Sequence, residues 1–244
     1  MTSKLKIYED EFKKFMGITQ FPPYELHTKE VSLNLAEQQG YEVIASAAYQ
    51  PQNNSHRLVV STNLLLTKHL IFHEFTHMLD AEMYVNGDKI RYAGISGFTE
   101  YHAAQVELMQ LLGAKTIKDT VSFSMNTIID TISGKKSVSQ YLNEKQQHAI
   151  SLFSRKSFPD DLSTLKTAIG ILYIYWGIRS ICEMYSTDYV EKISNTAFLA
   201  FIPSLDFSAS NNLMHGWLDE KNIELSITLY LKILFPLIKE FKLA

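Results

Sequence analysis

The sequence predicts an α+β protein in which a small antiparallel sheet packs on one helix and a largely helical C-terminal half follows. Residues 41–49 and 57–61 have the composition of two strands, and the polar, Pro-containing turn 50–55 joins them into a hairpin. Residues 64–85 then place apolar side chains at helical spacing with no interrupting Gly or Pro. Beyond residue 113 helical spacing continues through most of the chain.

The remaining elements follow from the same signals. We expect a loop over 86–97 because it contains several Gly, and a helix over 98–112 with Ser96 or Thr99 as its cap. The other segments with helical spacing are 4–16, 116–133, 139–154, 162–189 and 224–242. At 244 residues the chain is long enough for one large or two small domains. We expect a core over 1–133 and a helical region over 134–244 that packs on it.

Composition excludes several classes of function. The formal net charge is −3 and no basic block occurs, so the electrostatic footprint of a nucleic-acid-binding protein is absent. The longest apolar run, 168–178, ends at Arg179 and is too short to span a bilayer. The N-terminus lacks the apolar core of a signal peptide, and the single Cys182 lies in an apolar stretch that predicts a buried thiol. We therefore expect a cytoplasmic protein without a membrane span; the sequence leaves its oligomeric state open.

The residues from His73 to His77 have the form H-E-x-x-H. In a helix, residues four apart share one face, so both imidazoles can bind one metal ion. Glu74 lies beside that face, where its carboxylate could take a proton from metal-bound water. Two alternatives remain: a purely structural histidine pair, and a di-iron site, which would need a second E-x-x-H. The nearest candidate for that motif, Glu144 to His148, has one residue too many.

A catalytic zinc takes three protein ligands and keeps one open position. Glu100, expected in the first turn of the next helix, is our predicted third ligand. Ala103 and Ala104 would let this helix approach the histidine helix closely. Asp80 is better suited to a hydrogen bond with a ligand histidine than to the metal itself. The other competitors for the third position are Asp88, Glu107 and His102.

The order of hairpin, H-E-x-x-H helix and downstream Glu100 resembles the gluzincin metallopeptidases. More narrowly, residues 40–113 resemble the small intracellular peptidase-like domains of the ImmA/IrrE kind, in which the second helix opens with a ligand Glu followed closely by Ala. The resemblance implies a Zn²⁺ ion held by His73, His77 and Glu100, with Glu74 as the general base.

The chain departs from these patterns at several positions. Ala104 stands where the ImmA/IrrE kind commonly has Asn, and Gly113 stands where it has Pro. Larger gluzincins carry a carboxylate one turn after the ligand Glu, and here Ala103 and Ala104 leave that support absent. The metzincin pattern fails, because Asp80 replaces its Gly and Met83 its third His.

The resulting expectation is a zinc-dependent metallopeptidase that hydrolyses a peptide or protein substrate with a metal-activated water. An extended peptide could add to the exposed edge of the small sheet as a further strand. Candidates for stabilising the oxyanion are Tyr92, Tyr101 and His215. One alternative is a catalytically silent peptidase-like fold that binds a protein, although a structural zinc would not need Glu74. A weaker one is a membrane-surface protein acting through its C-terminal helices.

Overall fold

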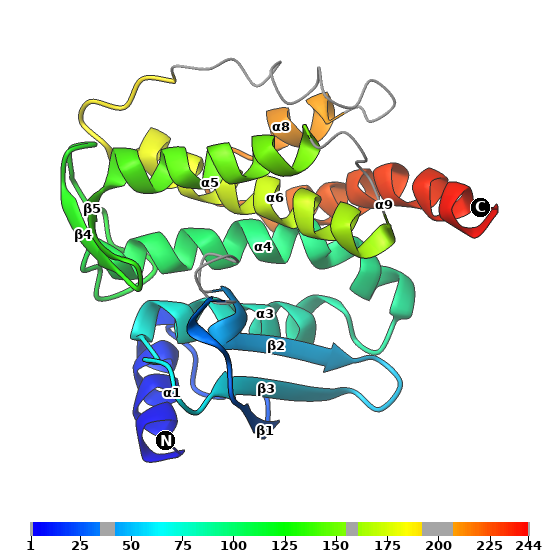
Figure 1. The fold of residues 1–244 in the computed structure, drawn as a ribbon, viewed down its shortest axis with the longest axis horizontal. Coiled ribbons are helices and arrows are strands. Elements are labelled where there is room, and N and C mark those ends of the chain that lie inside the picture. The colour runs from blue at the N-terminus through cyan, green and yellow to red at the C-terminus, as the bar shows by residue number, and fades with distance from the viewer. Residues whose placement is uncertain (1, 35–41, 155–160, 192–206, 244) are drawn as a thin grey trace. The chain divides into compact units, whose positions relative to one another are not determined.

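The computed structural model describes residues 2–34, 42–154, 161–191 and 207–243 (Figure 1). Its contacts divide into two compact units. The first comprises Met1–Tyr92, Val106–Val121 and Ile128–Lys136. The second comprises Ala93–Gln105, Ser122–Thr127 and Ser137–Ala244. The boundary expected after residue 133 stays a prediction.

The first unit contains a three-stranded sheet in the order β1-β3-β2. The expected hairpin is confirmed: β2 (Ala45–Gln50) pairs antiparallel with β3 (Ser55–Ser61). A further strand, β1 (Tyr24–Lys29), pairs parallel with β3, so the sheet is mixed rather than wholly antiparallel. Most of β1 is exposed, which explains why its sequence carries no apolar pattern. The part of the expected first strand before Ala45 is instead a 3₁₀ turn, η1 (Glu42–Ile44).

The sheet packs on α3 (Lys68–Tyr84), the helix predicted around H-E-x-x-H (Figure 1). Thr67 is its N-cap residue, and the chain leaves it through Asn86 and Gly87, both with positive φ. The N-terminal helix α1 (Thr2–Met16) also packs on α3. Aromatic rings fill this contact, with the centroid of Phe12 lying 5.2 Å from Phe72 and 5.5 Å from Phe75. Edge-to-face pairs of this kind add to the free energy of apolar burial.

The next helix, α4 (Lys89–Leu111), begins earlier than expected and contributes residues to both units. The loop predicted over 86–97 is therefore wrong beyond Asp88, whose carboxylate caps α4 by accepting from the backbone N–H groups of Ile90 and Arg91. Gly97, taken as a loop signal, serves close packing. A Cβ there would lie 2.6 Å from Cδ2 of Tyr230.

The chain after α4 also departs from expectation in one place. The helix predicted over 116–133 is wrong; its last residues form β4 (Ile128–Thr131), which pairs with β5 (Gly134–Ser137). Gly134 has a φ of 105° in the turn between these strands, a conformation that glycine adopts at little cost. Apolar spacing alone cannot separate so short a strand from a helix.

The predicted helices of the second unit are confirmed. They are α5 (Val138–Phe153), α6 (Leu162–Tyr185), which ends earlier than the expected residue 189, and α9 (Glu220–Leu243). The short helix α8 (Ser208–Leu213) was not predicted. The central helix α6 packs against both α5 and α9, and its residues from Ile171 to Cys182 are all buried. Cys182 is therefore a buried thiol, as expected. No helix of the described residues is long and apolar enough to cross a membrane. The sequence is also apolar over residues 197–207, and of these the structure describes only Phe207.

Candidate metal centre

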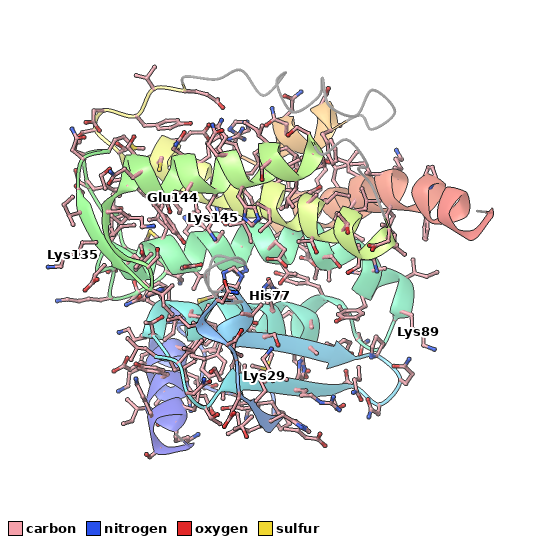
Figure 2. The ribbon with its side chains drawn as sticks, viewed as in Figure 1. Lys29, His77, Lys89, Lys135, Glu144 and Lys145 are labelled. Atoms are coloured by element: carbon pink, nitrogen blue, oxygen red, sulfur yellow. The ribbon has the colours of Figure 1, made fainter. Side chains whose placement is uncertain are left out.

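The predicted motif lies in the middle of α3, where the helix is almost wholly buried. His73 is 9% exposed and Glu74 7%. The rings of His73 and His77 share one face of α3, with centroids 4.8 Å apart and planes at 76°. This is the relation that the four-residue spacing predicts. His77 is labelled in Figure 2. Helical geometry therefore presents two imidazoles side by side.

Glu74 is held at the edge of the sheet. Its Oε2 atom accepts a hydrogen bond from the backbone N–H of Ala47 in β2, at 2.5 Å. Glu74 follows His73 directly in α3, and this contact fixes its carboxylate against β2. Burial makes such a bond valuable, because an unpaired carboxylate out of water is costly.

A second carboxylate contacts the histidine pair from α4. Oε2 of Glu107 lies 3.0 Å from Nδ1 of His73, and both side chains are largely buried. Within an imidazole, Nδ1 and Nε2 point in different directions. A ring held at Nδ1 therefore keeps Nε2 for another partner.

Glu100 lies on α4 two helical turns before Glu107, on the same face. One ligand atom from each of His73, His77 and Glu100 falls within 4.8 Å of the others; His73 is buried, and the other two are partly buried. Within the described part of the chain, no other such group of His, Cys, Asp or Glu occurs. Two imidazoles and one carboxylate are the donor set of many catalytic zinc sites.

Two expectations for α4 are wrong: that Glu100 lies in its first turn, and that Ala104 serves its close approach to the histidine helix. Glu100 lies in the interior of α4 rather than in its first turn. Ala104 faces α6, where its Cβ would lie 2.9 Å from a Cβ at Gly177. Close packing within the second unit therefore explains this small residue. The far end of α4 is fixed by Gly113, which has a φ of 83°.

That end is a Schellman motif. The N–H of Ala114 donates to the carbonyl of Met109 and the N–H of Gly113 to that of Gln110, at 3.0 and 3.1 Å. With Asp88 capping the other end, α4 is a continuous helix that carries Glu100 and Glu107 in a fixed relation.

Two of the competing ligands, Asp88 and His102, have other roles in the described structure. Asp88 is occupied as the cap of α4. His102 stacks on Phe98, with ring centroids 5.5 Å apart, which agrees with a packing role. Asp80 is 1% exposed. Its expected hydrogen bond to a histidine ring or a backbone group stays a prediction.

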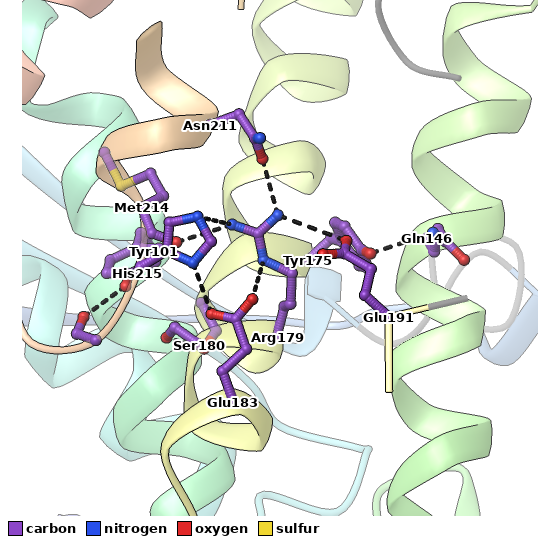
Figure 3. Close-up of polar contacts among 12 residues, drawn as sticks. Tyr101, Gln146, Tyr175, Arg179, Ser180, Glu183, Glu191, Asn211, Met214 and His215 are labelled. Atoms are coloured by element: carbon purple, nitrogen blue, oxygen red, sulfur yellow. Dashed lines mark hydrogen bonds and ion pairs between the residues drawn. The ribbon is translucent and has the colours of Figure 1, made fainter. Parts of the chain in front are cut away.

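Two of the three oxyanion candidates belong to a different network in the second unit (Figure 3). The hydroxyl of Tyr101 donates to the carbonyl of Gly216 at 2.5 Å, and burial raises the pKa of Tyr101. His215 lies with Nδ1 2.8 Å from Oε2 of Glu183. Both side chains anchor the segment after α8. The third candidate, Tyr92, packs its ring 5.4 Å from that of Tyr49.

Arg179 is the centre of this network and was not singled out as a functional residue from the sequence. It is fully buried and donates to Oδ1 of Asn211 at 2.8 Å and to the carbonyl of Met214 at 2.9 Å. Its guanidinium also lies 3.4 Å from Glu183 and 3.8 Å from Glu191. The only sign of this role in the sequence is that Arg179 is a charged residue at the end of an apolar helical run. The network links α6 to the chain around α8.

No protein-family model matches this sequence, and comparisons with curated proteins and with solved structures give no significant match. A metal centre is therefore supported by geometry: two imidazoles and one carboxylate could hold one metal ion, and the carboxylate of Glu107 contacts His73.

Proposed function

We propose that the protein is a zinc-dependent peptidase whose metal is held by His73, His77 and Glu100. The observation that carries the proposal is the position of Glu74. Glu74 follows His73 directly in α3, and its carboxylate is tied to the edge strand β2. A zinc ion with only a structural role would not require a carboxylate at this place.

The edge of β2 suggests where a substrate would bind. In an antiparallel pair, successive residues point their N–H and C=O groups alternately toward and away from the partner strand. Ala47 donates its N–H to Glu74, so it belongs to the outward set, together with Ala45 and Tyr49. Their carbonyl groups are acceptors for the N–H groups of an extended peptide that adds to the sheet. Such a peptide would run past Glu74.

Each group then has one task in hydrolysis. His73, His77 and Glu100 would hold a zinc ion, which would lower the pKa of its water toward about 7 and polarise the peptide carbonyl. Glu74 accepts the proton of that water as the new C–O bond forms. It later donates the proton to the leaving nitrogen as the C–N bond breaks. The Ala47 N–H keeps one carboxylate oxygen of Glu74 in place, so the other can exchange the proton.

Substitution of Glu74 by Gln tests the proposal. Zinc content is measured on purified wild type, Glu74→Gln, His73→Ala and His77→Ala, and cleavage on a mixture of fluorescence-quenched peptides of random sequence. We expect about one zinc per chain in wild type and in Glu74→Gln and loss of zinc from both histidine variants. We also expect Glu74→Gln to lower the cleavage rate by about 10²–10⁴-fold, because an amide cannot accept the proton.

A control variant on the same helix makes the test specific. Glu82 pairs with His56 at 3.0 Å, so Glu82→Gln removes a comparable charge without touching the proposed centre. It should keep both zinc and activity. Equal zinc in wild type and both histidine variants would refute the metal site. Zinc binding without cleavage of any peptide in the mixture would instead favour a protein-binding module.

A further inference from the structure

We propose that Glu107 is a positioning residue that holds the His73 ring so that its Nε2 atom faces the metal. The inference rests on the metal site of the proposed function. It assigns to Glu107 the orientation of a ligand and no direct contact with the ion or the substrate. The carboxylate contacts Nδ1 of His73 at 3.0 Å.

The contact between Glu107 and His73 is largely buried, which strengthens its hold on the ring. The side chain of His73 is 11% exposed and that of Glu107 13%, so water competes weakly for either group. A neutral imidazole carries its proton on either ring nitrogen, and a carboxylate that accepts from Nδ1–H selects one form. The selected form leaves the lone pair on Nε2, which is the atom a metal binds. Ring rotation is restricted by the same bond.

The geometry of α4 separates the roles of its two acidic residues. Glu100 and Glu107 are seven residues apart, which places them on one face but roughly 10 Å apart along the helix axis. Glu100 belongs to the group of possible ligands, and Glu107 does not. The carboxylate of Glu107 instead contacts Nδ1, the other nitrogen of the His73 ring. One helix therefore supplies both a ligand and the residue that orients another ligand.

The test measures metal affinity rather than activity. Zinc dissociation constants are determined by competition with a chromogenic chelator for wild type, Glu107→Ala, Glu107→Gln and the control Glu82→Ala. A lost partner of a ligand histidine weakens metal binding by about 10–100-fold, and we expect this loss for Glu107→Ala. Glu107→Gln keeps an oxygen that can accept from Nδ1–H and should recover most of the affinity. Glu82→Ala removes another carboxylate–histidine pair of the same unit and should bind zinc as wild type does.

A second readout distinguishes failure of the inference from failure of the metal site. In the metal-free protein, nitrogen NMR of the His73 ring should show the Nδ1–H form in wild type and a mixture of forms in Glu107→Ala. If wild type binds no zinc but shows this difference, the proposed function fails, while Glu107 is still shown to set the ring form of His73. Wild-type zinc affinity and an unchanged ring form in Glu107→Ala would overturn the inference. So would a loss above about 10³-fold accompanied by an altered cobalt(II) absorption spectrum, because Glu107 would then be a ligand.

Discussion

Replacing Gly177 by Ala should destabilise the second unit because α4 and α6 touch there through their backbones. A Cβ at Gly177 would lie 2.2 Å from the carbonyl oxygen of Tyr101 and 2.9 Å from the Cβ of Ala104. Carbon and oxygen atoms pack at separations above 3 Å, so the helices would have to part by about 1 Å. Inserting a methyl group into such a packed contact costs about 1–3 kcal/mol.

A matched variant removes the effect of helix propensity. Gly170 lies on the same helix, and the nearest atoms to a Cβ there belong to the Glu100 side chain at 3.8 Å, an ordinary contact distance. Both substitutions gain the preference of Ala over Gly in a helix, about 1 kcal/mol. The gain cancels in the comparison, so Gly177→Ala should be less stable than Gly170→Ala by the overpacking cost of about 1–3 kcal/mol.

Urea unfolding followed by tryptophan fluorescence measures this difference in the second unit. The chain has two tryptophans, Trp176 and Trp217, and both belong to that unit. The measurement uses the metal-free protein, so that metal binding by Glu100, which lies beside Gly170, does not affect the measured stability. If Gly177→Ala is as stable as Gly170→Ala, the close approach of α4 and α6 at this point is wrong.

Three further predictions concern other parts of the chain. Arg179→Met should lower the free energy of unfolding by about 1–3 kcal/mol in urea titrations, since it leaves the buried carbonyl of Met214 without its donor; an unchanged free energy of unfolding would contradict this role of Arg179. Burial raises the pKa of the Cys182 thiol to about 12, so iodoacetamide at pH 8 should label it far more slowly in the folded protein than in urea, and equal labelling rates would argue against burial. The pKa of Asp188 is lowered from 3.8, first by the N–H of Met125, so its stabilisation is present above pH 3.8 and is lost as the pH falls through the lower folded value. Asp188→Asn should accordingly be less stable than wild type at pH 7 and equal to it in strong acid, and a deficit that persists in acid would refute this linkage.

Local sequence signals were sufficient for the elements nearest the candidate centre. The four-residue spacing of His73 and His77 sets their side-by-side position as soon as the segment is helical. The polar turn before Ser55 fixes the hairpin in the same way, because a short connection leaves the two strands no other arrangement. These properties depend on residues close together in the sequence, which is why the sequence by itself determined them.

Only the tertiary structure decided the remaining features, because their causes lie far apart in the chain. Gly97 favours a loop in isolation, yet it sits inside α4 where rings of α6 and α9 leave no room for a larger residue. Glu107 was considered only as a competing ligand, and its place on the Nδ1 side of His73 follows from how α3 and α4 lie in the fold. The partners of Arg179 come from α6, the chain around α8 and Glu191, and no sequence pattern joins them. Local spacing fixes which side chains share a helix face, whereas packing of distant segments fixes what those faces meet.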